Sequence, residues 1–266
     1  MPRGPSPHSN GAVKRIAMLP TLLTLSNFFA GLLAVSWGID ALSLTGSEES
    51  GLEFYRKLEA SCALVFFGMV ADALDGKVAR LTDSMSGFGR QLDSFADFLN
   101  FGVAPALTLY AWTLSEPRGA GWIAVLVYAI CCVMRLARFN VGIKTTEGGD
   151  KRFFTGVPAP AGALLVLFPI FATKAVPGWP VVPREAISAY MFVVGGLMIS
   201  KLPTPSLKAA KVRADHARYV LVAVIAIFAA LVTYPWVTLF TLDVFYIVTV
   251  LVALVQWRRT QPPKAG

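Results

Sequence analysis

The chain has 266 residues, of which 55% are hydrophobic and 15% are charged, and its mean hydropathy is +0.60. A soluble domain usually carries about a quarter charged residues, so the composition excludes an ordinary soluble protein. It indicates an integral membrane protein with several helical spans, each needing ~20 apolar residues. The net charge of +8 is of the size found in nucleic-acid-binding proteins. The distribution of the basic residues along the chain shows whether such a partner is needed.

Apolar runs predict an all-α membrane bundle of eight transmembrane helices. They cover residues 19–39, 58–79, 90–114, 121–139, 157–176, 186–202, 217–234 and 237–257. The segment before the first run, residues 1–18, begins with a stretch rich in Pro, Gly and Ser. We expect this segment to be a disordered or interfacial tail.

The basic residues fix the expected orientation. With the N-terminus in the cytoplasm, 19 of the 24 Lys and Arg residues lie on the cytoplasmic side, as the positive-inside bias requires. Eight spans then place both termini in the cytoplasm of a multi-pass cell-membrane protein. Contact with anionic lipid headgroups, worth about 1 kcal/mol per basic side chain, explains the positive charge, so no nucleic-acid partner is needed.

The second and third runs carry four aspartates, although carboxylates are costly in a bilayer. Asp72 and Asp75 are three residues apart, and Asp93 and Asp97 are four apart, so each pair shares one helix face. The connection between the two runs is short and polar, which predicts antiparallel neighbouring helices. All four carboxylates are therefore expected to meet at the cytoplasmic end.

Four carboxylates at close range repel one another, and Arg80 alone cannot neutralise them. Divalent cations with oxygen ligands are the natural partner, and the carboxylate set favours Mg²⁺ or Mn²⁺. Two such ions a few ångströms apart are suited to phosphoryl transfer, because they contact both the attacked phosphate and the leaving group.

Two small residues follow the first aspartate pair. Gly76 lies inside a predicted helix, where glycine costs about 1 kcal/mol relative to alanine, and Ala79 lies about one turn further on. Small residues at this spacing let two helices pack closely. Beside four aspartates, they also favour a nucleotide or phosphate lying on the bare strip.

The residues together form a long pattern with fixed spacing. It reads Asp72-x-x-Asp75-Gly76-x-x-Ala79-Arg80, eight residues, then Gly89-x-x-x-Asp93-x-x-x-Asp97. This pattern resembles, at every fixed position, the signature of the CDP-alcohol phosphotransferases. The resemblance implies transfer of a phosphatidyl or similar group from a CDP-linked lipid to an alcohol, with release of CMP.

The resemblance also assigns roles. It implies that the four aspartates hold two metal ions and that Asp97 is also the general base. It implies contacts with the CDP-lipid at Gly76, Arg80 and Ser86, and the strip at Ala79 is expected to carry the cytidine. Residues 20–24 resemble the family's Pro-Asn-x-x-Thr segment, which adds Thr24 to the lipid contacts, although Thr21 stands where Asn is usual.

Three further segments, residues 135–141, 153–160 and 200–206, resemble the phosphatidylserine synthase branch of the family. This resemblance implies CDP-diacylglycerol as the donor and L-serine as the acceptor. Arg135 and Arg138 lie at the cytoplasmic end of the fourth run, where they are expected to bind the serine carboxylate or a lipid phosphate. Asn140 is expected to contact the serine ammonium. Alternatively, both arginines reach out to lipid headgroups as anchors.

The predicted organisation is a six-helix core over residues 19–202, a cytoplasmic loop with two extra helices over 203–257, and a basic tail over 258–266. The last two runs carry no motif that the sequence reveals. Glycerol 3-phosphate or inositol as acceptor remains an alternative, and a cation transporter or a structural membrane protein is a more distant one. The sequence leaves a homodimer open.

Overall fold

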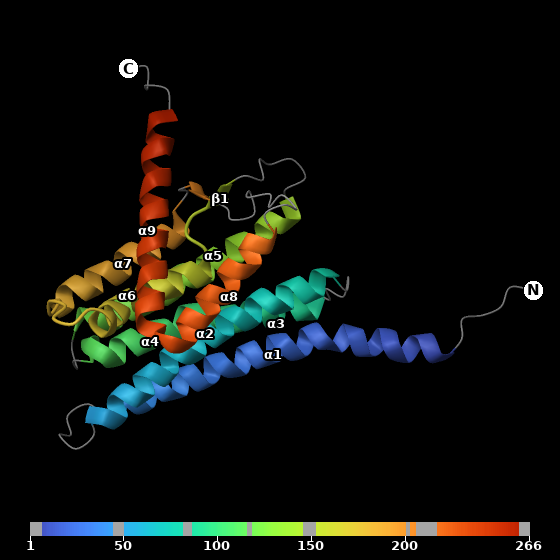
Figure 1. Cartoon of the computed structure of the whole chain (residues 1–266), viewed down its shortest axis with the longest axis horizontal. Coiled ribbons are helices and arrows are strands. Elements are labelled where there is room, and N and C mark those ends of the chain that lie inside the picture. The colour runs from blue at the N-terminus through green and yellow to red at the C-terminus, as the bar shows by residue number, and fades with distance from the viewer. Residues whose placement is uncertain are drawn as a thin grey trace, which may run out of the picture. The chain divides into compact units, whose positions relative to one another are not determined.

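The computed structural model describes residues 7–44, 51–81, 87–115, 119–145, 153–200, 203–205 and 217–260. Its described elements are helices, apart from one short two-stranded ribbon, and the chain divides into two compact units, residues 1–115 and 116–266 (Figure 1). The prediction of an all-α architecture is therefore confirmed, with the ribbon as a small addition.

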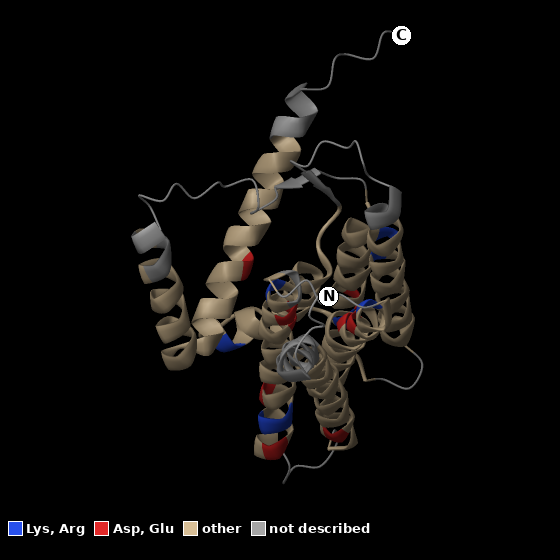
Figure 2. Ribbon diagram, turned by 90° about the vertical axis from the view of Figure 1, so that its right-hand side faces the viewer, with Lys and Arg blue, Asp and Glu red and all other residues tan. Residues whose placement is uncertain are grey.

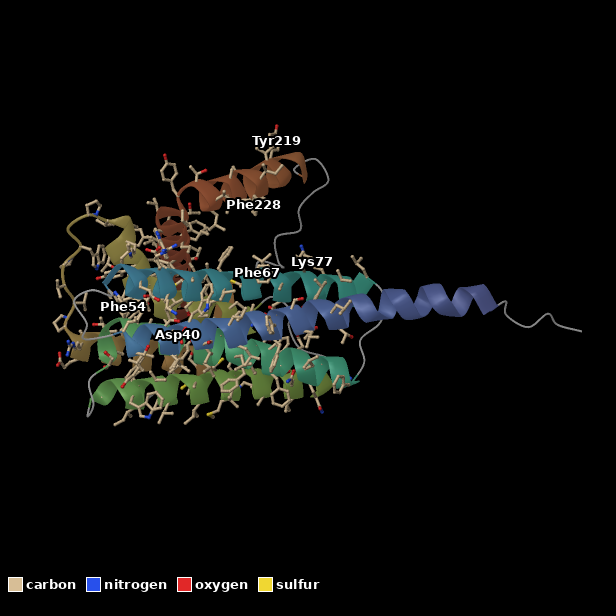
Figure 3. The ribbon with its side chains drawn as sticks, turned by 90° about the horizontal axis from the view of Figure 1, so that it is seen from below. Asp40, Phe54, Phe67, Lys77, Tyr219 and Phe228 are labelled. Carbon is tan, nitrogen blue, oxygen red and sulfur yellow. The ribbon has the colours of Figure 1, made fainter. Side chains whose placement is uncertain are left out.

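The first unit consists of three long helical stretches that lie side by side (Figure 1). They are α1 (Pro7–Ser43), α2 (Gly51–Leu81) and a stretch built from α3 (Gly87–Asp97), the π-helical η2 (Phe98–Val103), α4 (Ala104–Leu109) and the π-helical η3 (Tyr110–Leu114). In Figure 3, Asp40 of α1 lies near Phe54 at the start of α2, while Lys77 lies at the opposite end of α2. Helices α1 and α2 are therefore antiparallel neighbours.

Helix α1 begins earlier than the sequence indicated. The predicted disordered or interfacial tail covers residues 1–18, but the helix already starts at Pro7. Each residue added to an existing helix gains one hydrogen bond, so a helix formed in the apolar run extends backwards with little cost. Proline is tolerated at the first helical position, which fits a start at Pro7.

Two π-helical segments interrupt the third stretch, where the sequence predicted one uniform helix. In η2, the N–H of Ala104 donates to the carbonyl of Leu99, five residues earlier. Pro105 follows at once and cannot donate a backbone hydrogen bond, and a proline ring crowds the carbonyl four residues before it. The wider π turn relieves this crowding, so Pro105 gives a physical reason for η2 directly after Asp97.

The three stretches pack through small and polar groups. The hydroxyl of the fully buried Ser61 on α2 donates to the Ala34 carbonyl on α1 at 2.8 Å and lies 2.7 Å from the hydroxyl of Thr108 on α4. Near the end of α1 and the start of α2, the buried Ala41, Leu58 and Ala111 form an apolar cluster. Such contacts replace the hydrophobic effect as the source of helix association inside a membrane.

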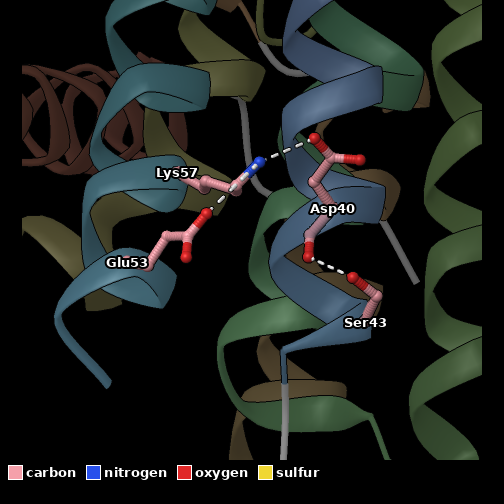
Figure 4. Close-up of polar contacts among 4 residues, drawn as sticks. All are labelled: Asp40, Ser43, Glu53 and Lys57. Atoms are coloured by element: carbon pink, nitrogen blue, oxygen red, sulfur yellow. Dashed lines mark hydrogen bonds and ion pairs between the residues drawn. The ribbon is translucent and has the colours of Figure 1, made fainter. Parts of the chain in front are cut away.

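At the same end of the first unit, Lys57 joins α2 to α1 (Figure 4). Its ammonium donates to the Asp40 carboxylate at 2.8 Å and lies 3.9 Å from the Glu53 carboxylate. The hydrogen bond to Asp40 raises the pKa of Lys57 above its ordinary value. Lys57 therefore stays charged at physiological pH, at the end of α2 away from Lys77.

The second unit holds the remaining elements. They are α5 (Ala120–Thr145), β1 (Phe153–Thr155), α6 (Ala159–Ala175), α7 (Arg184–Ile199), β2 (Pro203–Pro205), α8 (Ala217–Thr233) and α9 (Pro235–Thr260). Helix α5 packs on α7, and α9 packs on α6 and α8. Phe168 of α6 stacks on Phe240 of α9 with ring centroids 5.4 Å apart, and the Tyr190 hydroxyl of α7 donates to the Leu165 carbonyl of α6 at 2.6 Å.

Strands β1 and β2 form an antiparallel ribbon in which Phe154 pairs with Thr204. Directly after β1, the chain turns at Gly156 with a φ of 81°, a conformation that favours glycine. A Cβ at this position would lie 2.6 Å from the Met198 carbonyl oxygen and 2.7 Å from that of Ser200. Gly156 therefore lets the chain pass close to the end of α7.

The described helices have the surface of a membrane protein. Three of them are long and apolar enough to cross a membrane, over Thr21–Ser43, Ala120–Val141 and Pro235–Val255, and Ala159–Ala175 and Val222–Thr233 are shorter apolar helices. Charged residues are sparse along the ribbons (Figure 2). Aromatic side chains such as Phe67 on α2 and Phe228 on α8 are exposed (Figure 3), and extended apolar surface of this kind suits contact with lipid chains.

Candidate functional site

Three of the four predicted aspartates meet in the first unit. One carboxylate oxygen from each of Asp72 and Asp75 on α2 and Asp93 on α3 lies within 4.8 Å of the others. Asp75 is buried, and Asp72 and Asp93 are half-buried. The spacing along each helix and the short connection between the helices thus bring the carboxylates together as predicted.

The fourth aspartate, Asp97, is the last residue of α3. It does not belong to the 4.8 Å cluster, but its carboxyl group lies close enough to that of Asp72 for the two to interact. One oxygen of Asp97, Oδ1, is buried without a hydrogen-bond partner among the described residues. Asp97 therefore lies at the edge of the cluster, and its Oδ1 could accept a hydrogen bond or bind a cation.

Thr24 of α1 contacts the cluster from a third helix. Its buried hydroxyl donates to Oδ2 of Asp75 at 2.9 Å, and Oδ1 of Asp75 has no partner among the described residues. The sequence placed Thr24 among the lipid contacts. The geometry gives it a further role, because this hydrogen bond fixes the orientation of the Asp75 carboxylate.

The residues present fit a divalent cation. The donor set is oxygen only, two buried carboxylate oxygens lack partners, and within the described part of the chain none of the four aspartates forms an ion pair with Lys or Arg. Two unit charges 4 Å apart repel by about 4 kcal/mol at an effective dielectric constant of ~20. A cation with carboxylate ligands would remove this cost, and Mg²⁺, Mn²⁺ and Ca²⁺ prefer such ligands.

The predicted lipid-binding strip is described in part. Gly76 follows Asp75 in α2 and is half-buried. Ala79 and Arg80 continue the same helix, and their side chains lie outside the described part of the structure. Ser86 lies outside the described residues altogether.

The predicted serine-binding residues all lie on α5 in the second unit. Arg135 is buried and donates from Nε to the Val157 carbonyl at 2.7 Å, while the exposed Arg138 donates to the Ile199 carbonyl at 2.8 Å. Asn140 is exposed on the same helix. These bonds connect α5 to the segment just before α6 and to the end of α7. Because a guanidinium has five N–H donors, each arginine keeps further donors that could bind a ligand.

Two groups of buried polar residues were missed by the sequence reasoning. In the first unit, Asn27 and Asn100 are fully buried and hydrogen-bonded to each other. In the second, Asp243 of α9 is 1% exposed, and neither its Oδ2 nor the hydroxyl of Tyr246 has a partner among the described residues. A carboxylate in an apolar run had drawn attention to Asp72, and the same signal was present at Asp243.

The apolar helices indicate an integral membrane protein, and the carboxylate cluster on two neighbouring helices could hold a divalent cation. The sequence of residues 17–200 matches the family described as CDP-alcohol phosphatidyltransferase. This match covers well over half of the chain, and the chain belongs to that family.

Several curated relatives bear the name CDP-diacylglycerol–serine O-phosphatidyltransferase. The Mycobacterium leprae protein is 34% identical over 246 residues, which is 91% of this chain and 75% of the relative. The Helicobacter pylori protein is 30% identical over 199 residues, or 75% of this chain and 76% of the relative. The Bacillus subtilis protein is 35% identical over 150 residues, or 56% of this chain and 73% of the relative.

Proposed function

We propose that this protein transfers the phosphatidyl group of CDP-diacylglycerol to the hydroxyl of L-serine, which gives phosphatidylserine and CMP. The observation that carries the proposal is the meeting of the Asp72, Asp75 and Asp93 carboxylates within 4.8 Å, in a chain of the CDP-alcohol phosphatidyltransferase family. The choice of donor and acceptor rests on relatives that bear the serine phosphatidyltransferase name.

The four aspartates would hold two divalent ions, Mg²⁺ or Mn²⁺. When bound, these ions would screen the diphosphate of the donor and the charge that develops on the leaving CMP. The buried oxygen atoms of Asp75 and Asp97 that lack partners among the described residues support this assignment, because buried polar atoms are normally satisfied. Thr24, through its bond to Asp75, would keep one ligand in its orientation.

Asp97 would act as the general base. Its free oxygen accepts the proton of the serine hydroxyl while the serine oxygen forms a bond to the phosphorus nearer the diacylglycerol. The bond between that phosphorus and the oxygen of CMP breaks in the same transfer. We infer direct attack, since the family pattern in this chain contains no Cys or Ser–His pair that could form a covalent intermediate.

The donor would lie with its acyl chains in the bilayer and its cytidine on the strip made by Gly76 and Ala79. Arg80 and Ser86 would contact its phosphates, and Thr24 adds a contact from α1. Gly76 supports this placement because it is next to the cluster and has no side chain to hinder approach. The acceptor would use Arg135 or Arg138 for its carboxylate and Asn140 for its ammonium.

The membrane arrangement that suits this chemistry has eight spans with both termini in the cytoplasm. The positive-inside distribution of Lys and Arg supports it. The aspartates would then open to the cytoplasm, where L-serine is available, and the Lys57–Asp40 pair would mark the opposite side. The domain match over residues 17–200 agrees with a catalytic core of six helices followed by two additional ones.

The test is a measurement of CMP release by the purified protein in detergent with CDP-diacylglycerol as donor. L-Serine, glycerol 3-phosphate and inositol are offered in turn, with an Asp97→Asn variant as the blank. We expect release with serine to exceed release with either alternative at least ten-fold. Release with glycerol 3-phosphate or inositol alone would keep the reaction class and overturn the acceptor. No release with any of the three would overturn the reaction class.

A further inference from the structure

A buried pair of amides joins α1 to the π-helical segment η2. Nδ2 of Asn100 donates to both the main-chain carbonyl and Oδ1 of Asn27, each at 2.7 Å. Both residues are fully buried. Burying an amide between apolar helices is costly unless it is hydrogen-bonded. The two bonds satisfy Nδ2 of Asn100 and Oδ1 of Asn27, whereas Nδ2 of Asn27 and Oδ1 of Asn100 are buried without a partner among the described residues. Because a shift of η2 along α1 would break these two bonds as well, the pair favours the observed register of η2 against α1.

The helices approach closely at this point because two glycines leave room. A Cβ on Gly68 of α2 would overlap the Asn100 amide group, and a Cβ on Gly31 of α1 would lie 3.1 Å from Asn100 Nδ2. The Asn100 side chain therefore fills a space bounded by α1, α2 and η2. Small residues of this kind let helix backbones come together in membranes.

The same amide also contacts the chain beside Asp97. Asn100 Nδ2 lies 3.3 Å from the carbonyl of Ala96, the residue before Asp97. Asp97 ends α3, and η2 begins at the next residue. The π-helical segment thus widens the helix directly after the carboxylate, and Asn100 holds the widened turn. Such π turns occur frequently at functional sites.

Helix α1 contacts both carboxylate-bearing helices through one face. Thr24 and Asn27 are three residues apart on α1 and so share a face. Thr24 binds Asp75 of α2 at 2.9 Å, and Asn27 binds Asn100 at 2.7 Å, just after Asp97. The relative positions of the two aspartate pairs are therefore set by α1 as well as by direct contact between α2 and α3.

We propose that Asn27 and Asn100 are positioning residues that hold the Asp93–Asp97 pair at the correct distance from the Asp72–Asp75 pair for metal binding. This inference rests on the proposed function, in which those carboxylates hold divalent ions. Metal sites depend on such support, because ligands must be held within about 0.5 Å of their productive positions. Mg²⁺ in particular requires near-ideal octahedral geometry.

The matched control is Ser61, which makes the same kind of contact elsewhere in the first unit. Its hydroxyl is fully buried, joins α2 to α1 at the Ala34 carbonyl and contacts Thr108 of α4. Ala34 lies ten residues beyond Thr24 on α1, about 15 Å along the helix. Ser61→Ala thus removes a buried interhelical hydrogen bond while leaving the surroundings of the aspartates intact.

The experiment measures Mn²⁺ binding without any substrate, from the free Mn²⁺ signal in electron paramagnetic resonance, on purified full-length protein in detergent. Asn100→Ala, Asn27→Ala and Ser61→Ala are compared with the unmodified protein, and the melting temperature of each is recorded. We expect Asn100→Ala to weaken Mn²⁺ binding about 10–100-fold, as loss of supporting partners does at other metal sites. Ser61→Ala should lower the melting temperature and leave Mn²⁺ affinity unchanged.

Asn27→Ala should have an intermediate effect, because Asn100 keeps its bond to the Asn27 main-chain carbonyl. If Asn100→Ala does not fold, the Mn²⁺ affinity of Asn27→Ala tests the positioning role. Equal weakening by the Asn27 and Ser61 variants, or unchanged Mn²⁺ affinity in the asparagine variants, would overturn the positioning role. Absence of Mn²⁺ binding by the unmodified protein would instead overturn the proposed metal site, and the inference with it.

Discussion

Asp97 is distinguished from the other three carboxylates by its surroundings. It lies at the end of α3, contacts Asp72, and keeps one buried oxygen without a partner among the described residues. Asp75, by contrast, is held by Thr24. A carboxylate that binds metal through one oxygen and keeps another for a proton is suited to work as a positioned base.

Replacing Asp97 with Asn should remove turnover while leaving CDP-diacylglycerol binding largely intact. The amide is similar in shape but cannot accept the serine proton with comparable basicity. We expect kcat to fall about 10²–10⁴-fold, the range associated with loss of general base catalysis. CMP release and lipid binding are measured on the same preparation, with Asp40→Asn, at the Lys57 end of the unit, as the control. Near-normal turnover in Asp97→Asn would show that another group takes the proton.

The residues of the candidate site could be predicted from the sequence because their spacing is local. Asp72 and Asp75, or Asp93 and Asp97, share a face whenever their segment is helical. Partners from distant segments could not be predicted in this way. Neither the bond from Thr24 to Asp75 nor the bond from Asn100 to Asn27, which spans 73 residues, has a signal in either segment alone.

At the scale of the elements, all eight predicted runs correspond to helical stretches within the described residues. Three of these helices are long and apolar enough to cross a membrane, and two shorter ones are apolar. In a bilayer, such runs form helices because a helix satisfies its backbone hydrogen bonds internally. Local departures were harder to predict. The π-helical segment η2 depends on how Pro105 is accommodated, and the ribbon pairs segments that are about 50 residues apart.

Gly156 gives a test at the scale of elements. Gly156→Ala should destabilise the second unit by about 1–3 kcal/mol, because its φ is 81° and a Cβ would strike the Met198 and Ser200 carbonyls at the end of α7. Gly178→Ala is the control, since its φ is 77° but no atom lies within 4 Å of the added Cβ. Thermal unfolding in detergent should show the larger loss for Gly156→Ala. Equal losses would mean that the contact with α7 contributes nothing.

At the scale of the whole molecule, the proposed orientation can be tested by labelling single cysteines in intact cells. The native Cys62, Cys131 and Cys132 are buried, which keeps background labelling low. Cysteines placed at Lys144, Lys211 and Lys264 should be shielded from a membrane-impermeant reagent, whereas those at Ser47 and Gly178 should react. The reverse pattern would place the aspartates on the side of the membrane away from cytoplasmic serine.

The two units differ in how much of their structure could be predicted from the sequence. The first unit contains the carboxylates and their supporting contacts, and its chemistry follows from a handful of spacings. The second unit contains Arg135 and Arg138, whose bonds to main-chain carbonyls were not predictable from their residue type. Asp243 of α9 lies beyond the matched domain. It is a buried carboxylate, so the last helix carries a buried polar group in addition to its apolar side chains.

The proposed function requires that the four aspartates form a metal-loaded site for phosphatidyl transfer. The most direct measurement is serine-dependent CMP release by the purified protein after treatment with excess chelator, followed by stepwise return of Mg²⁺ or Mn²⁺. We expect chelation to abolish release, either ion to restore it, and Asp72→Asn or Asp93→Asn to shift the restoring concentration upward. Full activity in excess chelator would contradict the metal-loaded site.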